Sequence, residues 1–428
     1  MSKTFNPAFE SLKEDVMGFL NEVQINYPNA LSLASGRPDQ KFFDFTDVTK
    51  YIDLYVKYTS DKNILQDIND LGQYNKAKGI INDLVSIYLE KEYNIKANPE
   101  NILINVGTQE GLVIAIMALC DKDSDVIIVE DPAYVGITHY SLLAGYNLAP
   151  VAVKSDGLCL EDLKQKIIEN NTNNKKVKIV YATPNFQNPT GVSMSMKNRL
   201  LLLEMAEYYD FYIIEDNAYG DFVIEGIKHP TLKSLDTKRR VIYLHSLSKI
   251  IYPALRIGIM VADQIVEEVS FSNIMAKIKG YITVNTPSIT QAAFAGILIE
   301  NNFTLQNYNR KKVQDLTLRR DYILQALDKY FIENNESWSK KISWNKPKGG
   351  FFLTLKLPIK ILKEDVIECA KKFNVICTPM SFFYLNEGGE NEIRLAYSYV
   401  KIEDLDRAIY NLSEYLKYKI GNKNENYK

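Results

Sequence analysis

A lysine preceded by two serines and followed by an arginine is the part of this chain best suited to covalent chemistry. Lys249 closes a short segment that contains Ser246 and Ser248, an apolar run precedes it, and Arg256 follows seven residues later. Burial at a strand end favours the neutral form of a lysine amine, which attacks aldehydes. Serine hydroxyls and an arginine fork bind phosphate. The segment therefore predicts a Schiff base to an aldehyde cofactor that carries a phosphate; the competing interpretation is a lysine in a surface loop.

A glycine, a threonine and a glutamine form a second candidate for phosphate binding. Gly107, Thr108 and Gln109 separate an apolar run at 101–106 from an apolar helical pattern at 110–120. At such a junction, free backbone N–H groups and the helix dipole attract an anion. The competing interpretation is an ordinary turn between a strand and a helix.

Four more side chains offer what the ring of such a cofactor needs. Asp216 follows an apolar run, and a buried carboxylate there requires a partner such as a protonated pyridine nitrogen. Tyr219 and Asn188 offer a hydroxyl and an amide to a ring oxygen, and Tyr134 offers a ring that stacks on the pyridine face. Each residue alone is explained as well by a helix cap, a turn or a core tyrosine.

Alternating apolar and amphipathic segments predict how these residues are positioned. Strands are expected at 101–106, 126–130, 177–182, 211–215, 241–245 and 257–261, with helices between them. Nearly continuous apolar strands in this alternation indicate an α/β fold whose mostly parallel central sheet is covered by helices. Ligands bind beyond the carboxyl ends of such strands, and nearly every motif above falls at such an end.

The remaining pattern predicts further helices and a smaller second domain. Helices are expected at 265–275 and from 289 to 327. Beyond about residue 330, short strands at 351–357, 376–379 and 392–396 alternate with helices at 364–373 and 402–418, as in an α+β domain. We therefore expect an N-terminal arm with part of the small domain at 1–45, a large cofactor-binding domain at 46–328 and the C-terminal small domain at 329–428.

Composition argues against several other classes of protein. The 428 residues carry a net charge of −2, which gives no electrostatic reason to expect nucleic acid or an anionic membrane as a partner. The longest apolar stretch, 112–120, is too short to span a bilayer. Three scattered histidines argue against a histidine metal site. Four cysteines without paired spacing, together with a polar N-terminus, predict reduced thiols and a cytoplasmic location.

The motifs follow one another in a single order at the ends of alternating strands, and together they resemble a known family. Segments 129–134, 187–191, 214–219 and 246–256 are similar to those of fold type I pyridoxal-phosphate enzymes in the aminotransferase class I/II family. The resemblance runs from about residue 31 to about residue 416 and is nearest to 2-aminoadipate and kynurenine aminotransferases and to the aminotransferase domain of MocR-type regulators. It implies the fold type I PLP-transferase architecture, pyridoxal 5'-phosphate as cofactor, and transfer of an amino group from an L-α-amino acid to a 2-oxo acid, with 2-oxoglutarate as the expected acceptor.

The resemblance implies a role for each motif. Lys249 matches the lysine that binds the cofactor and then moves the substrate proton, and Asp216 matches the acid paired with the pyridine nitrogen. Asn188 and Tyr219 match the ligands of the ring oxygen, and Tyr134 matches the stacking ring. The cradle around the cofactor phosphate corresponds to Gly107, Thr108, Gln109, Ser246, Ser248 and Arg256.

The resemblance also implies contacts to the substrate and to a second subunit. Arg394 matches the arginine that binds the substrate α-carboxylate, which a planar fork holds through two hydrogen bonds. Gly36 matches a glycine beside the substrate, where Asn188 is expected as well. Tyr74 matches a tyrosine that reaches the phosphate in the partner subunit, so the site is expected to be complete only in a homodimer. The phenylalanines of segment 348–352 are expected in the core.

Two residues depart from the family pattern. Arg37 stands where relatives commonly have leucine or isoleucine, and its charge suits a side-chain carboxylate of a substrate such as 2-aminoadipate or glutamate, or else forms an exposed ion pair worth little. Asn217 stands where many relatives have a second aspartate, which removes one negative charge near the cofactor. Two alternatives stay open: a pyridoxal-phosphate β-lyase on the same scaffold, and a non-catalytic MocR-like effector-binding protein without its DNA-binding module.

Overall fold

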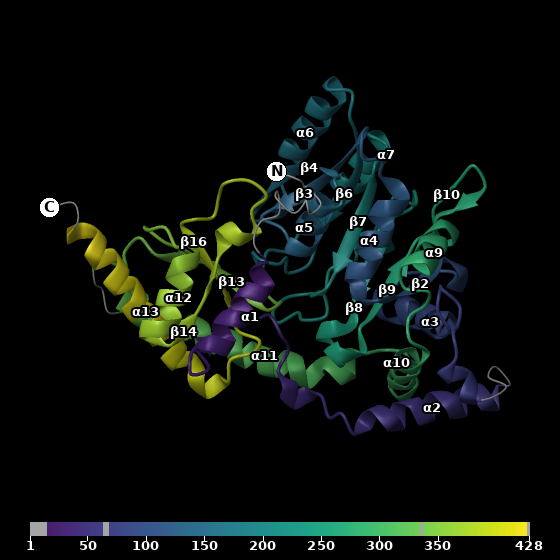
Figure 1. Cartoon of the computed structure of the whole chain (residues 1–428), viewed down its shortest axis with the longest axis horizontal. Coiled ribbons are helices and arrows are strands. Elements are labelled where there is room, and N and C mark those ends of the chain that lie inside the picture. Colours follow the sequence, from purple (N-terminus) through teal and green to yellow (C-terminus); the bar gives the residue numbers. More distant parts are fainter. Residues whose placement is uncertain (1–14, 63–67, 334–336, 426–428) are drawn as a thin grey trace, which may run out of the picture.

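An eight-stranded sheet forms the centre of the larger unit in the computed structural model, which describes residues 15–62, 68–333 and 337–425 (Figure 1). In spatial order its strands are β2 (Ile102–Val106), β9 (Ile257–Val261), β8 (Val241–Ser246), β7 (Tyr212–Asn217), β6 (Lys176–Ala182), β3 (Asp125–Asp131), β4 (Asn147–Lys154) and β5 (Gly157–Leu158). Strands β8, β7, β6, β3 and β4 run parallel, whereas β9 is antiparallel to both of its neighbours and β5 is antiparallel to β4. The predicted mostly parallel sheet is confirmed, with the strand at 257–261 reversed.

Helices cover both faces of this sheet because both faces of its strands are apolar. All six residues of β8 are buried. Leu244 packs on one face with α4 (Gly107–Leu119) and α9 (Phe271–Ile282), and Tyr243 packs on the other with α3 (Asn82–Tyr93) and α10 (Ser288–Glu300). The remaining helices of this unit include α2 (Asp47–Asp61), α5 (Val135–Leu143), α6 (Leu160–Thr172), α7 (Met196–Tyr208) and α8 (Leu232–Leu235).

The helix predicted at 265–275 is wrong in its first half. There the chain forms a hairpin of β10 (Ile265–Val266) and β11 (Val269–Ser270), and α9 begins only at Phe271. The turn residues Glu267 and Glu268 have φ of 50° and 67°, the left-handed conformation that a two-residue hairpin turn requires. Ile265 is 58% exposed, so the apolar spacing does not mark a buried helical face.

Two other elements of this unit differ from the predicted pattern. Strand β4 is absent from the prediction because Pro150 and partly exposed residues interrupt its apolar run. The single helical pattern from 289 to 327 is two helices, α10 and α11 (Gln306–Leu327), separated by a turn in which Asn302 and Phe303 have positive φ. A left-handed residue ends a helix, and spacing alone does not reveal it.

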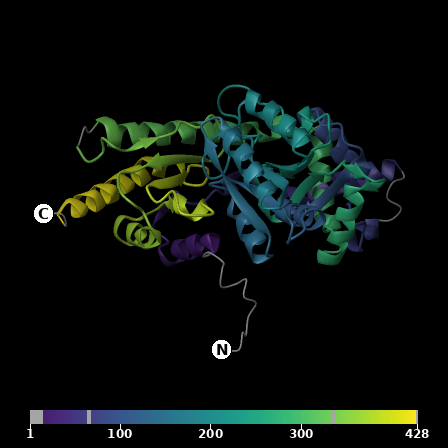
Figure 2. The ribbon, with the colours of Figure 1, turned by 90° about the horizontal axis from the view of Figure 1, so that it is seen from above.

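The smaller unit is built on a four-stranded antiparallel sheet. Its strands, in spatial order, are β12 (Ser343–Trp344), β13 (Phe352–Lys356), β16 (Glu392–Ala396) and β15 (Thr378–Pro379). Helices α12 (Lys363–Phe373) and α13 (Ile402–Glu425) pack beside it, and α13 runs alongside α11 (Figure 2). The strands and helices predicted beyond residue 350 are present in this α+β arrangement, except that the single strand expected at 376–379 is two, β14 (Val375–Ile376) and β15, which belong to different sheets.

The N-terminal segment packs on the smaller unit. Helix α1 (Val16–Asn26) buries Val16 and Leu20 in one apolar cluster with Val366 of α12. The following strand, β1 (Leu31–Ser32), pairs in parallel with β14 (Val375–Ile376). These contacts place residues 16–32 beside α12 and β14. The division at residues 45 and 328 stays a prediction, and residues 1–14 of the predicted arm lie outside the described residues.

Candidate active site

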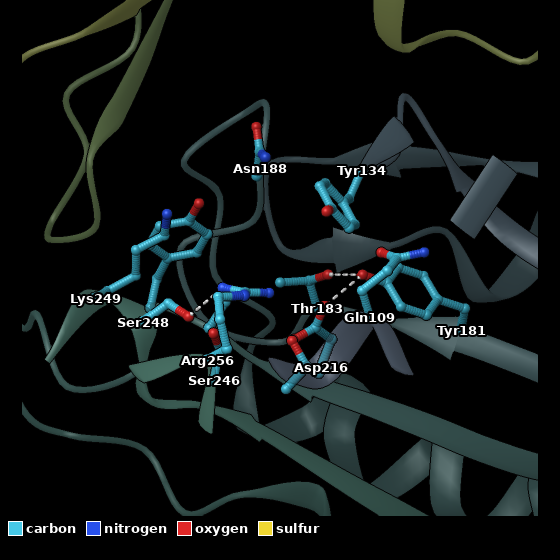
Figure 3. A pocket seen from close by; sticks show the side chains of 13 residues that line it. Gln109, Tyr134, Tyr181, Thr183, Asn188, Asp216, Ser246, Ser248, Lys249 and Arg256 are labelled. Atoms are coloured by element: carbon cyan, nitrogen blue, oxygen red, sulfur yellow. Dashed lines mark hydrogen bonds between the residues drawn. The ribbon is translucent and has the colours of Figure 1, made fainter. Parts of the chain in front are cut away.

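A cavity of about 140 Å³ lies at the carboxyl ends of the parallel strands (Figure 3). Ten residues that the sequence singles out line it together: Thr108, Gln109, Tyr134, Asn188, Asp216, Tyr219, Ser246, Ser248, Lys249 and Arg256. They come from the ends of several strands and from the turns that follow, which is where a parallel sheet binds its ligands. The cavity is also lined by Tyr181, Thr183 and Ala218, which sequence reasoning missed.

Lys249 ends the short 3₁₀ turn that directly follows β8. Its Nζ donates a hydrogen bond to the carbonyl oxygen of Gly36 at 3.2 Å. Burial lowers the pKa of the Lys249 ammonium to about 8, and the charges of Arg256, Arg394 and Arg37 act in the same direction. A lysine with this pKa has an appreciable neutral fraction near neutral pH, so it can attack an aldehyde and accept a proton.

Asp216, near the end of β7, has one carboxylate oxygen with a partner and one without. Tyr181 donates its hydroxyl proton to Oδ2 at 2.8 Å, and Thr183 in turn donates to the Tyr181 hydroxyl at 3.4 Å. Oδ1 is buried and accepts no hydrogen bond from the described residues. A buried oxygen of this kind is costly unless a donor reaches it. The protonated ring nitrogen of pyridoxal phosphate is such a donor, so the carboxylate fits that cofactor.

Burial raises the pKa of Asp216 to about 6, against the effects of the Tyr181 hydrogen bond and the Lys249 charge. Because the folded pKa exceeds the ordinary aspartate pKa of 3.8, the native state holds this proton more tightly than the unfolded chain. The protonated Asp216 carboxyl therefore stabilises the folded protein fully at pH values below the pKa of the unfolded chain. This stabilisation is lost as the pH rises through the folded pKa of about 6.

We expect Asp216→Asn to stabilise the cofactor-free protein relative to wild type increasingly as pH rises. A shift of this size corresponds to about 2–3 kcal/mol between roughly pH 4 and pH 8, because the amide cannot ionise. Urea unfolding of both proteins across this range measures the difference. A difference in unfolding free energy that does not change with pH would contradict the assignment of a raised pKa to Asp216.

The proposed phosphate end of the cavity lies where α4 begins. The helix starts at Gly107, three residues earlier than predicted, so the N–H groups of Thr108 and Gln109 belong to its first turn, where N–H groups have no intrahelical partner. The Arg256 guanidinium donates to the Ser248 hydroxyl at 3.0 Å. The main-chain carbonyl of Arg256 accepts from the Gly107 N–H at 2.9 Å. Gly107 has φ of 72°, and a Cβ there would lie 2.4 Å from the Arg256 guanidinium. These donors fit a phosphate.

A second cavity, of about 220 Å³, adjoins the first. Arg394, on β16, lies in it with its guanidinium between the rings of Phe352 and Phe383, at 4.4 and 4.6 Å from their centroids. Its Nη1 donates to Asn188 Oδ1 at 2.8 Å, its Nη2 donates to the Ala34 carbonyl at 2.7 Å, and its buried Nε has no partner among the described residues. Burial lowers the pKa of Arg394 to about 10. A buried guanidinium with donor capacity to spare suits a carboxylate ligand.

The N-terminal residues that the sequence singles out lie in the same second cavity. A Cβ on Gly36 would lie 2.5 Å from the tip of the Phe352 ring, so any larger residue there would force this ring to move. Phe351 and Phe352 are both buried and pack in the core, as expected, and Phe352 also lines this cavity. Arg37 is exposed and donates to Asn21 of α1 at 3.0 Å. It forms no ion pair within the described part of the chain.

Two other residues from the sequence lie apart from these cavities. Tyr74 is 85% exposed and lines a separate groove with Lys76 and Asp83, so one chain does not bring it to Lys249. Asn217 is buried, and its amide donates to the hydroxyl of Tyr243 at 2.8 Å. Asn217 therefore has a partner of its own and does not line either cavity.

The missed residues give different signals in the sequence. Tyr181 lies inside a buried strand, where an aromatic residue reads as core, and only its contact with Asp216 distinguishes it. Leu20, Asn21 and Gln24 of α1 line the second cavity, although no motif marks this helix. Among the described residues, no cluster of three or more histidine, cysteine or acidic side chains is arranged for a metal ion. No helix in the described ranges is long and apolar enough to cross a bilayer.

The fold and the site together define a class. A mostly parallel sheet with a reactive lysine, an unpaired buried carboxylate oxygen and phosphate donors at its carboxyl edge is the arrangement of fold type I pyridoxal-phosphate enzymes. The sequence profile of the aminotransferase class I and II family matches residues 30–412. The chain belongs to this family and is a pyridoxal-phosphate-dependent aminotransferase.

Similar proteins support this assignment over nearly the whole chain. The (S)-3,5-dihydroxyphenylglycine transaminase of Amycolatopsis orientalis is 36% identical, over 93% of this chain and 90% of its own. Kynurenine aminotransferase of Pyrococcus horikoshii, solved with PMP, has a TM-score of 0.83 at 28% identity and covers 97% and 98% of the two chains. The α-aminoadipate aminotransferase LysN of Thermus thermophilus, solved with N-(5'-phosphopyridoxyl)-L-leucine, has a TM-score of 0.80 at 25% identity and covers 97% and 98%.

Proposed function

We propose that the protein transfers the amino group of an L-α-amino acid to 2-oxoglutarate, with the two substrates occupying one site in turn. The observation that carries this proposal is that the two cavities share Tyr134, Asn188, Tyr219 and Lys249. A substrate held at Arg394 by its α-carboxylate therefore places its α carbon beside the Lys249 amine.

The following cofactor contacts are part of the proposal. Asp216 Oδ1 pairs with the pyridine nitrogen, Asn188 and Tyr219 bind the ring oxygen, and Tyr134 covers the ring face. The phosphate is held by Gly107, Thr108, Gln109, Ser246, Ser248 and Arg256. All of these residues except Gly107 line one cavity, and Gly107 lies against the Arg256 guanidinium. The free donors and acceptors described above are the further support.

The chain's own residues divide the catalytic tasks. When bound, pyridoxal phosphate supplies an aldehyde that captures amines and a ring that withdraws electrons from the substrate α carbon. Arg394 binds the α-carboxylate and turns the Cα–H bond toward Lys249. Lys249, with its pKa lowered to about 8, would accept the Cα proton as general base and then donate it to the cofactor carbon that carried the aldehyde. Asp216 keeps the opposite end of the cofactor positively charged.

Aromatic side chains around the second cavity support an aromatic amino acid as donor. Tyr134, Tyr219, Phe352, Phe383 and Tyr399 line it. The transaminase of Amycolatopsis orientalis and the kynurenine aminotransferase of Pyrococcus horikoshii are named for amino acids that carry an aromatic ring. Rings pack favourably against rings at 4.5–7 Å, so this wall favours such a side chain over a small one.

The experiment that tests the proposal is a half-reaction monitored by absorbance. The protein loaded with pyridoxal phosphate is mixed with single L-amino acids in the absence of any 2-oxo acid. Conversion of the cofactor to pyridoxamine phosphate with release of one equivalent of 2-oxo acid supports a transaminase and identifies the donor. Formation of pyruvate and ammonia without cofactor conversion would instead indicate a β-lyase. A protein that shows no absorbance from bound cofactor would refute the proposal.

We expect Arg37→Gln to raise KM for 2-oxoglutarate about tenfold and to leave KM for pyruvate unchanged. Arg37 lines the second cavity without an acidic partner among the described residues, so its charge is available to the distal carboxylate, which pyruvate lacks. Arg37→Lys, which keeps the charge, is the matched control and should retain most of the preference. Equal KM increases for both oxo acids would argue against this role.

We further propose that the site is complete in a homodimer in the cytoplasm. Tyr74 is exposed on a groove of about 760 Å³ that shares no lining residue with the two cavities, as expected if it serves a second copy. All four cysteines are free thiols, which supports a reducing compartment.

A further inference from the structure

The segment from Ala34 to Asp39, called the strap here, contacts both functional side chains of the substrate cavity. The Ala34 carbonyl accepts from Arg394 at 2.7 Å, and the Gly36 carbonyl accepts from Lys249 at 3.2 Å. The Arg37 carbonyl accepts from the Ser398 hydroxyl at 2.9 Å. The position of the strap therefore affects where the two functional side chains lie.

The N-terminal end of the strap is held by backbone pairing. Leu33 donates to the carbonyl of Ile376 at 2.8 Å and accepts from the Ala396 N–H at 2.6 Å. The first bond extends the parallel pairing of β1 with β14, and the second joins Leu33 to the end of β16. This end of the strap is therefore hydrogen-bonded to strands of the smaller unit.

The C-terminal end of the strap is held by a buried arginine. Arg319, on α11, is 1% exposed, and its guanidinium contacts the Asp39 carboxylate at the end of the strap. The same guanidinium binds Asp315 at 2.6 Å and the carbonyl of Val400. Val400 follows β16, the strand that carries Arg394. The Arg319 guanidinium thus connects α11, the strap and the loop that follows β16.

We propose that Arg319 is a positioning residue that, through Asp39, sets the spacing between the strap and Arg394 and so determines carboxylate affinity. The inference rests on the proposed function, because it takes Arg394 as the carboxylate ligand. A guanidinium presents its donors in fixed directions, so three partners on three segments fix the relative placement of those segments. A cavity of about 20 Å³, lined in part by Asp39, Ser398 and Lys249, adjoins the C-terminal end of the strap.

Asp39 and Asp315 form a matched pair for the test. Their side chains are 19% and 18% exposed, and both contact Arg319 and Lys41. Only Asp39 belongs to the strap. Loss of one negative charge beside Arg319 is therefore common to Asp39→Asn and Asp315→Asn, whereas loss of the strap anchor occurs in Asp39→Asn alone. Asparagine also keeps an oxygen that accepts from the Lys41 N–H, as Asp39 does at 3.0 Å.

The experiment compares maleate binding and steady-state kinetics in the enzyme loaded with pyridoxal phosphate. Maleate is a dicarboxylate without an amine, and its binding is followed by the change in cofactor absorbance. We expect Asp39→Asn and Arg319→Lys to raise the maleate Kd and the KM for 2-oxoglutarate about tenfold, with kcat changed less than about twofold. Asp315→Asn should leave Kd and KM within about twofold of wild type. If Arg319→Lys does not fold, the two aspartate variants still decide the question.

Two outcomes would overturn the inference. Equal effects of Asp39→Asn and Asp315→Asn would show that the loss of affinity comes from the missing charge beside Arg319 and not from the strap anchor, and no effect of Asp39→Asn would show that the strap needs no such anchor. Arg394→Leu, which removes the cation, separates this from the proposed function. Maleate binding that survives Arg394→Leu would refute Arg394 as the carboxylate ligand, whereas binding lost in Arg394→Leu but intact in Asp39→Asn would refute the positioning role alone.

Discussion

Replacement of Lys249 by alanine is expected to lower the rate of amino transfer by at least about 10⁴-fold, because the residue both captures the cofactor and moves the substrate proton. The variant should still bind pyridoxal phosphate through Asp216, Arg256 and the start of α4, since these contacts do not involve the amine. Stopped-flow absorbance with the best donor measures the half-reaction. Retention of more than about 1% of the wild-type rate would show that another group moves the proton.

Lys312 provides an internal comparison for the reactivity of Lys249. Burial lowers the pKa of Lys312 to about 7, below the value of about 8 for Lys249. On acidity alone, Lys312 would be the more reactive amine. However, it donates to the carbonyl of Ile250 at 2.6 Å, packs over the ring of Tyr308 and does not line the cofactor cavity. Borohydride reduction of the loaded enzyme followed by peptide mapping should therefore label Lys249 and leave Lys312 unmodified; label on Lys312 would contradict the site.

The second large effect is expected for Arg394→Leu, which should lower kcat/KM for an amino acid about 10³-fold. Arg394 is 3% exposed and is the buried arginine among the described residues that line this cavity, so a carboxylate that enters the Arg394→Leu cavity has no buried guanidinium to bind there. The leucine also leaves Asn188 and the Ala34 carbonyl without the donors that now reach them. Steady-state kinetics on the purified variant measure the loss.

A substrate without a carboxylate is the control for this prediction. A primary amine that matches the donor side chain makes no contact with the guanidinium, so its slow reaction with wild type and with Arg394→Leu should proceed at the same rate. The double comparison of variant and substrate isolates the energy of the carboxylate–arginine pair. If the amine loses as much activity as the amino acid, the substitution acts by disturbing the cavity rather than by removing a ligand.

Local sequence accounts for the large unit and for the cofactor cavity. Apolar runs of five to seven residues appear as strands, and the polar residues that end them meet at one edge, because parallel strands present their carboxyl ends together. Ten singled-out residues line one cavity for this reason, although their roles stay proposals. The sequence did not predict the turn at Glu267 and Glu268 or the end of the helix at Asn302, because left-handed residues leave the apolar spacing unchanged.

The substrate side of the site depends on contacts that no local pattern contains. Arg394 and Ala34 are 360 residues apart in the chain, and Arg319 and Asp39 are 280 apart. From the sequence, Tyr181 and Phe352 are both expected to be core aromatic residues. The structure shows that Tyr181 also contacts Asp216 and that Phe352 also packs against the Arg394 guanidinium. The chemistry of the cofactor end was therefore determined by the sequence, since its groups lie at or shortly after the ends of β2, β3, β6, β7 and β8, or directly before β9. The shape of the substrate end was decided only by the tertiary structure, since it is formed where the N-terminal strap, α11 and the small sheet pack together.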